Sequence, residues 1–189
     1  MNLSTLWAVL YFVWIVLEVY VGVATRRRKS QAKVQDRGTQ LLLWVTIVLS
    51  LTACGFLRHW HLAPMHVSDD WLKPASIAVL AAGLAVRIVA IVTLGRAFSA
   101  NVATHADQQL QRSGLYSVVR HPSYLGMEII FLALGLHTGD WACLAVDLIP
   151  PTLAVLYRIS VEEEALRALF GAEYEQYCRT TKRLVPGIY

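Results

Sequence analysis

The chain has 189 residues, of which 56% are hydrophobic and only 16% are charged, and its formal net charge is +4. Soluble domains carry about 25% charged residues, so this composition excludes a water-soluble globular domain, and the same hydrophobicity excludes an intrinsically disordered chain. The three cysteines are an odd number without paired spacing, which argues against a disulfide framework or a zinc site.

Five hydrophobic segments predict an all-α, polytopic integral membrane protein with about five transmembrane helices. The first contains 20 residues, enough to cross the ~30 Å hydrocarbon core of a bilayer. The fourth is shorter than a usual span, but Pro122 suits the first turn of a helix and lengthens it toward the membrane surface. Only Gly139 and Asp140 separate the last two segments, which predicts an antiparallel helical hairpin. The five segments are residues 5–24, 41–57, 74–94, 125–138 and 141–157.

The distribution of basic residues predicts the orientation. With the N-terminus outside, five crossings place residues 25–40, 95–121 and 158–189 in the cytoplasm, and these segments contain 14 of the 17 Lys and Arg residues. This asymmetry follows the positive-inside rule, so we expect the chemistry on the cytoplasmic side. We also expect two regions, a three-span membrane region over residues 1–94 and a region over residues 95–189 that carries the site.

The segment after the fifth span has a helical pattern. From Val161 onward, apolar residues recur at three- and four-residue steps, which predicts a C-terminal amphipathic helix. The three glutamates at residues 162–164 would lie in its first turn, where carboxylates favour the positive end of the helix dipole. The Pro-Gly pair at residues 186–187 would end it.

Spacing argues against several other chemistries. None of the 11 glycines forms a Gly-x-Gly pair, which excludes a dinucleotide-binding fingerprint and a P-loop. We also predict no nucleic-acid partner. His and Asp residues crowd the predicted outer loop, but they lack the spacing of a metal-ligand set, so we predict no metal site. These loop residues are His59, His61, His66, Asp69 and Asp70.

Two polar centres flank the predicted hairpin on its cytoplasmic side. Arg120 and His121 precede the helix that starts at Pro122, and an interfacial Arg-His pair explains them as well as a binding site does. Arg158 and Glu162 are four residues apart, so they share a helix face, either as a surface ion pair or as part of a site. Because the hairpin brings both centres to one depth, we predict that they form a single pocket.

One combination of motifs runs through the C-terminal half. It consists of Arg-His-Pro-Ser-Tyr at 120–124, Arg158, the acidic run at 162–164, Phe-Gly-x-Glu-Tyr-x-x-Tyr at 170–177 and Arg-x-x-Pro at 183–186. Over residues 95–187 the sequence thereby resembles the isoprenylcysteine carboxyl methyltransferases, and the phospholipid methyltransferases share part of the pattern. The N-terminal half resembles the short prokaryotic members only in its number of spans, which favours a bacterial or archaeal inner membrane over the endoplasmic reticulum.

The resemblance implies S-adenosylmethionine-dependent methyl transfer to the carboxylate of a lipophilic, prenylated substrate. It associates Arg158 with the substrate, and we assign catalysis to Arg158 and Glu162. Family members often have His-x-Leu-Val where this chain has Gln-Gln-Leu-Gln at 108–111, so backbone contacts are expected there more than side-chain contacts. The implied cofactor-binding residues are Gln108, Gln109, Leu110, Gln111, Tyr116, Arg120, His121, Pro122, Ser123, Tyr124 and Glu162.

Charged residues inside the predicted spans need an explanation of their own, because each costs a few kcal/mol at mid-bilayer unless it is paired or hydrated. For Arg87 and Asp147 we favour helix packing, for example an ion pair of Arg87 with one of the acidic residues Glu18, Glu128 and Asp147. Glu128 lies one turn beyond Tyr124 on the same helix face, so we predict that it binds substrate.

Besides carboxyl methylation, two alternative functions remain at this point, phospholipid N-methylation and a non-catalytic role. A terminal carboxyl group has a pKa of ~3.3–3.7, so it is an anionic nucleophile at pH 7 and needs no base. N-methylation of a phospholipid headgroup would require a base near the amine, and Arg158 favours the anionic acceptor instead. The third hypothesis is a non-catalytic membrane binding module, against which the intact Arg120, His121, Arg158 and Glu162 argue.

Overall fold

The computed structural model describes residues 2–26, 33–34, 38–95, 103–104 and 110–189. The predicted all-α architecture is confirmed, with a single two-residue antiparallel strand pair between β1 and β2 in the described part. The elements in chain order are α1 (Leu3–Arg26), β1 (Lys33–Val34), α2 (Thr39–Leu57), α3 (Asp69–Leu94), β2 (Ala103–Thr104), the 3-10 helix η3 (Gly114–Ser117), α4 (Pro122–Thr138), α5 (Trp141–Phe170) and α6 (Ala172–Thr180).

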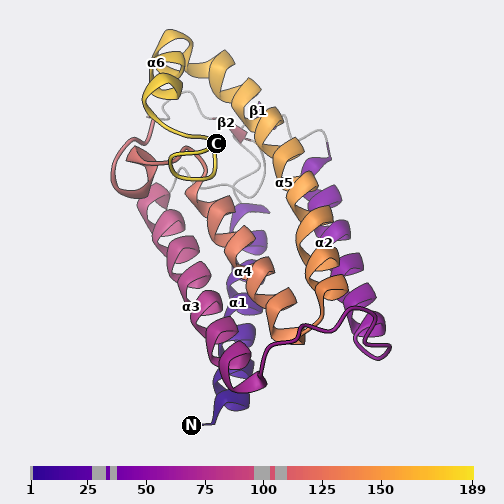
Figure 1. The fold of residues 1–189 in the computed structure, drawn as a ribbon. Helices are drawn as coiled ribbons and strands as arrows, with labels where there is room; N and C mark the ends of the chain where they lie inside the picture. The colour runs from indigo at the N-terminus through magenta and orange to yellow at the C-terminus, as the bar shows by residue number, and fades with distance from the viewer. Residues whose placement is uncertain (1, 27–32, 35–37, 96–102, 105–109) are drawn as a thin grey trace.

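Each of the five predicted hydrophobic segments forms a helix, and the five helices alternate in direction to make a bundle (Figure 1). α3 packs along α4, α4 packs along α5, α2 covers another side of α5, and α1 lies along α3. By length and composition, α1, α2, α3 and α5 are suited to cross a membrane. α4 has 17 residues, about 26 Å, and runs inside the bundle between α3 and α5. The two chain termini lie at opposite ends of the bundle.

The predicted hairpin between α4 and α5 is confirmed. Gly139 adopts the left-handed conformation, with φ of 71°, and ends α4. Asp140 caps α5 by accepting hydrogen bonds from the backbone N–H groups of Ala142 (2.8 Å) and Cys143 (3.2 Å), and it accepts a third from Ala63 (3.0 Å). Burial raises the pKa of Asp140, but these three donors outweigh it and hold that pKa below its ordinary value.

A single hydrophobic core joins the helices. It includes the buried side chains of Trp14, Ile47, Leu80, Ile130 and Ile159, which come from α1, α2, α3, α4 and α5 respectively. The core therefore draws on residues from both sides of the boundary predicted at residues 94 and 95. The division into two regions stays a prediction about the sequence.

The arginine within α3 pairs with an acidic residue, as the sequence predicted. The guanidinium of Arg87 in α3 donates to both carboxylate oxygens of Glu18 in α1, at 2.6 and 2.8 Å. Its third nitrogen donates to the hydroxyl (2.6 Å) and the carbonyl (3.1 Å) of Ser123 at the start of α4. One buried ion pair thus ties three helices together, and the predicted pairing of Arg87 is confirmed.

The C-terminal helix differs from the prediction. α5 continues without a break to Phe170, so the glutamates at residues 162–164 lie within a 30-residue helix and not in its first turn. A helix ends where the backbone can leave the helical conformation at low cost, and the first residue to do so is Gly171, with φ of 52°. α6 begins after it and ends at Thr180, before the Pro-Gly pair. The predicted apolar face is present in α6, where Tyr174 and Tyr177 are buried.

Candidate functional site

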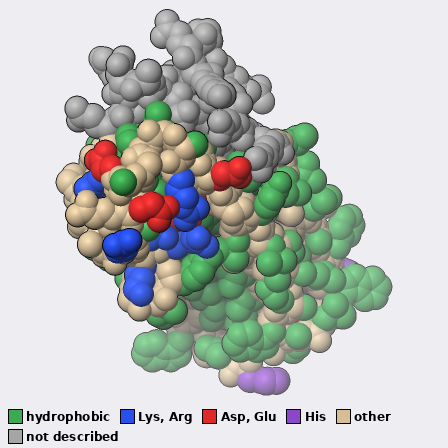
Figure 2. Space-filling model, turned by 90° about the horizontal axis from the view of Figure 1, so that it is seen from above, with side chains coloured by type: hydrophobic (Ala, Val, Ile, Leu, Met, Phe, Trp, Pro, Cys, Tyr) green, Lys and Arg blue, Asp and Glu red, His purple; other side chains and the backbone are tan. Residues whose placement is uncertain are grey.

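Three parts of the chain meet at the end of the bundle that carries the C-terminus (Figure 1). They are the residues that lead into α4, the second half of α5, and α6 with the segment that follows it. Viewed onto this end, basic and acidic side chains gather there, whereas much of the visible surface beyond is hydrophobic (Figure 2). The two polar centres of the sequence therefore lie at the same end of the molecule, as predicted.

The start of α4 is fixed by the C-terminal segment. The backbone N–H of Arg120 donates to the carbonyl of Lys182 (2.8 Å), and that of His121 donates to the carbonyl of Arg183 (3.1 Å). His121 occupies the position before the helix and Pro122 the first helical position, where its missing N–H group leaves no intrahelical hydrogen bond unmade. Residues about 60 positions apart thus share one short backbone ladder.

A tyrosine hydroxyl links the two predicted catalytic residues. Nε of Arg158 donates to the hydroxyl of Tyr124 (2.7 Å), and this hydroxyl donates to Oε2 of Glu162 (2.8 Å). Arg158 is buried, with 2% of its surface exposed, and it also donates to the hydroxyl of Thr39 at the start of α2 (2.9 Å). Arg158 and Glu162 are therefore connected across the hairpin through α4.

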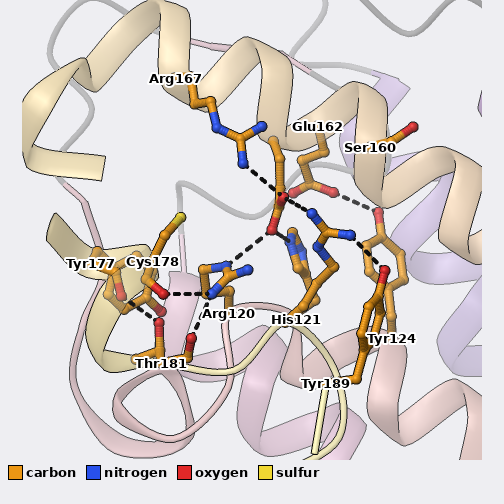
Figure 3. Close-up of polar contacts among 12 residues, drawn as sticks. Arg120, His121, Tyr124, Ser160, Glu162, Arg167, Tyr177, Cys178, Thr181 and Tyr189 are labelled. Carbon is orange, nitrogen blue, oxygen red and sulfur yellow. Dashed lines mark hydrogen bonds and ion pairs between the residues drawn. The ribbon is translucent and has the colours of Figure 1, made fainter. Parts of the chain in front are cut away.

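The central carboxylate of this end belongs to Glu163, which sequence reasoning did not single out. It lies among Arg120, His121 and Arg167, which Figure 3 shows. Its side chain is fully buried, and Oε1 accepts from Nε of Arg120 (3.0 Å). Oε2 accepts from Arg183 (2.8 Å) and from Arg167 (3.3 Å). Nε2 of His121 lies 3.4 Å from Oε1, and no described residue gives this nitrogen a hydrogen bond of good geometry.

The position of Glu163 has a signal in the sequence. Val155 and Ile159 are fully buried on α5, and the next step of four residues along that face arrives at Glu163. This signal depends on treating residues 141–170 as one helix. The prediction of a new helix at Val161 hid it.

Tyrosines and main-chain carbonyls complete the surroundings of Arg120. Its guanidinium donates to the carbonyls of Thr181 (2.6 Å) and Cys178 (3.3 Å). The hydroxyl of Tyr177 donates to the carbonyl of Tyr116 (2.6 Å), and burial raises the pKa of Tyr177 to about 12. Burial, followed by the charge of Glu163, raises the pKa of Tyr174 as well. Both phenols are therefore neutral at physiological pH.

The remaining predicted site residues are spread more widely. The hydroxyl of Tyr116 donates to the carbonyl of Ala90 (3.3 Å), and Ser123 is bonded to Arg87. The amide of Gln111 donates to the carbonyl of Thr93 (3.3 Å) and the hydroxyl of Ser113 (3.1 Å). Leu110 is half-buried beside it, whereas Gln108 and Gln109 lie outside the described residues. Glu128 contacts Thr152 of α5, at 2.5 Å.

A metal centre was not predicted. Within the described ranges, no group of three or more His, Cys, Asp or Glu side chains is placed to hold a metal ion.

Comparison with known proteins identifies the family. The model of the isoprenylcysteine carboxyl methyltransferase (ICMT) family matches residues 76–168, which run from within α3 to the last turn of α5 and include the Tyr124–Arg158–Glu162 link. A probable protein-S-isoprenylcysteine O-methyltransferase of Oryza sativa subsp. indica is 34% identical over 160 residues, which cover 79% of this chain and 81% of the relative.

Two further relatives mark the range of the similarity. Protein-S-isoprenylcysteine O-methyltransferase B of Arabidopsis thaliana is 28% identical over 138 residues, and the match covers 70% of this chain and 63% of that relative. Methanethiol S-methyltransferase 1 of Bradyrhizobium diazoefficiens is 38% identical over 72 residues, 38% of this chain and 24% of that relative. With the match to the rice protein extending over about four-fifths of both chains, the chain belongs to the isoprenylcysteine carboxyl methyltransferase family of enzymes.

Proposed function

We propose that this chain is an integral-membrane methyltransferase that uses S-adenosylmethionine to methylate the carboxylate of an isoprenylcysteine-like, lipophilic acceptor. Family membership supports methyl transfer. The observation that carries the site assignment is the Tyr124 hydroxyl, which joins an arginine and a carboxylate of α5 to the start of α4. Of these three side chains, the guanidinium of Arg158 suits an anionic acceptor and the carboxylate of Glu162 suits a cationic cofactor.

The donor set fits S-adenosylmethionine, which supplies an activated methyl group when bound. Glu162 is half-buried, so its carboxylate can face a cationic ligand while it keeps the hydrogen bond from Tyr124. Nε2 of His121 is buried 3.4 Å from Oε1 of Glu163, and it makes no hydrogen bond of good geometry with the described residues. An unused buried nitrogen costs free energy, and a polar ligand group would recover it.

Arg158 is proposed to hold the acceptor. Because a terminal carboxylate is ionised at pH 7, the residues around it need to orient the nucleophile and exclude water, and no side chain has to remove a proton. A guanidinium binds a carboxylate with two parallel hydrogen bonds, which fixes direction as well as charge. Tyr124 and Thr39 hold the guanidinium of Arg158 from two other helices, so its orientation is set by the fold.

Several residues expected to bind the cofactor are proposed to position the site as well. The side chains of Arg120, Ser123 and Tyr116 all make hydrogen bonds inside the protein. Arg120 bonds to the C-terminal segment, whereas Ser123 and Tyr116 bond to α3. Contacts of the cofactor with these residues and with residues 108–111 stay predictions. The proposal also includes contacts of the cofactor with backbone groups at these positions.

The proposed location is a bacterial or archaeal inner membrane, with the N-terminus outside and the site in the cytoplasm. The alternation of the five helices supports the crossing pattern, because it gathers Gly38, residues 110–121 and residues 171–189 at one end. Those segments belong to the stretches that contain 14 of the 17 basic residues. The lipid bilayer and a prenylated acceptor are the proposed partners.

An acceptor assay tests this proposal. Purified protein in lipid vesicles is incubated with S-adenosylmethionine labelled in its methyl group and, separately, with N-acetyl-S-farnesylcysteine, phosphatidylethanolamine or methanethiol. We expect label on the farnesylcysteine in a form that mild base releases as methanol, as a methyl ester requires. Label on the phospholipid alone would transfer the function to headgroup N-methylation, and label on the thiol alone to S-methylation.

Replacing Arg158 by Lys tests the role of its guanidinium. Lysine keeps the charge but cannot form two parallel hydrogen bonds to a carboxylate, so we expect kcat/KM for the farnesylcysteine to fall by about 10²-fold or more. Binding of S-adenosylmethionine, measured by calorimetry, is expected to change little. Full turnover in R158K would remove Arg158 from the acceptor site.

A further inference from the structure

Glu128 in α4 has one carboxylate oxygen without a partner. Its Oε2 lies 2.5 Å from the hydroxyl of Thr152 in α5, while Oε1 is buried and receives no hydrogen bond from any described residue. The side chain as a whole is only half-buried, so a ligand between the helices can approach it. A buried carboxylate oxygen that accepts no hydrogen bond costs free energy, and such a group in a native structure calls for an explanation.

The position of Glu128 connects it with the proposed acceptor site. It follows Tyr124 by four residues on α4, so the two side chains lie one turn apart on one face, with Cβ atoms about 5–6 Å from each other. On α5, Thr152 precedes Arg158 by six residues, about 9 Å of helix rise. The Glu128–Thr152 contact is therefore the next polar contact between these two helices, one step further into the membrane than the Tyr124–Arg158 contact.

Asp147 provides the comparison. Its Oδ1 is likewise buried and lacks a hydrogen-bond partner among the described residues. Asp147 precedes Arg158 by 11 residues, about 16 Å along α5, which is too far for one amino-acid-sized group to reach both. Of the two acids, only Glu128 lies within reach of a ligand held by Arg158.

The chemistry of the acceptor supplies a matching donor. In an isoprenylcysteine-like acceptor the group nearest the carboxylate that can donate a hydrogen bond is the N–H on the α-carbon. A carboxyl side chain retains an acceptor oxygen whether or not it is protonated. We propose that Glu128 accepts a hydrogen bond from this N–H, so that the enzyme selects N-acylated or peptide-linked amino acids over lipophilic acids without a nitrogen. This inference rests on the proposed function.

Two matched acceptors test the inference. One is N-acetyl-S-farnesylcysteine, and the other is its acetoxy analogue, in which an oxygen replaces the N–H and nothing else changes. A site built to accept a hydrogen bond discriminates strongly against an analogue that lacks the donor. We expect the wild-type protein to methylate the N–H acceptor with a kcat/KM about 10- to 100-fold higher than that of the acetoxy analogue.

Variants assign the discrimination to Glu128. In Glu128→Leu the ratio of the two kcat/KM values is expected to approach one, whereas Glu128→Gln, which keeps an amide oxygen as acceptor, is expected to retain most of it. Thr152 keeps an acceptor in both variants, because its hydroxyl also lies 2.6 Å from the carbonyl of Leu148. Asp147→Asn is the matched control, for which the ratio should equal that of the wild type.

Because the readout is a ratio within one protein preparation, partial loss of folded enzyme does not affect it. A wild-type ratio near one, or a high ratio that persists in Glu128→Leu, would overturn the inference while leaving carboxyl methylation intact. If the wild-type protein methylates neither farnesylated acid, the proposed function itself fails and the inference fails with it.

Discussion

At the scale of single residues, Glu163 organises the proposed site without being its most accessible acid. Four basic side chains approach its buried carboxylate: Arg120 and His121 from the residues before α4, Arg167 from α5 and Arg183 from the C-terminal segment. In a low-dielectric interior, a carboxylate with several charge-assisted hydrogen bonds holds its partners in fixed positions. Glu163 thereby determines where His121 and the start of α4 lie relative to Glu162.

Replacing Glu163 by Gln should therefore destabilise the protein strongly. The amide removes the counter-charge from Arg120 and Arg183 while leaving both guanidinium groups in place, and breaking a buried ion pair in this way costs about 3–5 kcal/mol. The free energy of unfolding in detergent micelles measures the effect. Glu173→Gln is the control, because its ion pair with Arg112 is exposed and its loss should cost no more than about 1 kcal/mol. Equal stability of E163Q and E173Q would contradict the role of Glu163.

The sequence predicted part of this site for clear physical reasons. The hairpin fixes the distance between its two helices, so the meeting of Tyr124, Arg158 and Glu162 followed from the two-residue turn and helix periodicity. The contacts of Glu163 depend instead on Arg183, which reaches it from a segment beyond α6. No local pattern contains that path, because it depends on the turn at Gly171 and on backbone pairing with residues 182 and 183.

At the scale of elements, the cap of α5 controls one end of the hairpin. Asp140→Ala removes three hydrogen bonds to backbone N–H groups, and we expect it to lower the free energy of unfolding by about 2 kcal/mol. Asp140→Asn keeps one acceptor oxygen and should cost about half as much. Asp69→Asn, in the first turn of α3, is the control with an exposed carboxylate.

The charge of Asp140 makes this contribution dependent on pH. Because the folded protein lowers the pKa of Asp140, the ionised carboxylate contributes stability above its unfolded pKa of ~3.9, and this contribution is lost as the pH falls through the lower, folded value. The stability difference between wild type and D140N is therefore largest at neutral pH and shrinks below about pH 4. A difference that grows on acidification would contradict this assignment.

The approach of α3 to α4 depends on a glycine. A Cβ atom at Gly126 would lie 2.7 Å from the backbone nitrogen of Arg87 and 2.9 Å from its Cα, so α4 and α3 touch through their main chains. Small residues at such contacts allow membrane helices to pack closely. We expect Gly126→Ala to cost about 1–3 kcal/mol and to displace Arg87 from Glu18. Gly55→Ala, where no atom lies within 4 Å, is the matched control, and thermal unfolding compares the two.

The elements themselves were the most predictable level. Five apolar runs separated by polar segments determine five helices, because the backbone in a membrane must satisfy its own hydrogen bonds. The largest misplacement, a helix start at Val161, arose because the acidic run resembles a helix start. In the structure Asp140 caps the start of this helix and Gly171 ends it, so the acidic run lies inside the helix and marks no helix start.

At the scale of the whole molecule, one buried network links the membrane region to the site. Arg87 joins Glu18 of α1 to Ser123, which lies next to Pro122 at the start of α4. Thr39 at the start of α2 holds Arg158. The first three helices are therefore linked to both parts of the site, the start of α4 and Arg158 of α5. This explains how hydrophobic spans without catalytic side chains fix the geometry of a polar end.

Cysteine labelling tests the orientation of that polar end. In a Cys178→Ser background, Arg179→Cys and His66→Cys each place one exposed thiol, at opposite ends of the bundle, while Cys54 and Cys143 are buried. In sealed vesicles of known sidedness, a membrane-impermeant maleimide should reach Arg179→Cys only from the cytoplasmic side and His66→Cys only from outside, because most basic residues lie in segments at the first end. The reverse result would place the site outside. Labelling of both thiols from one side would contradict the bundle. Three helices, α3, α4 and α5, separate residues 66 and 179, so in that case they could not all cross the membrane.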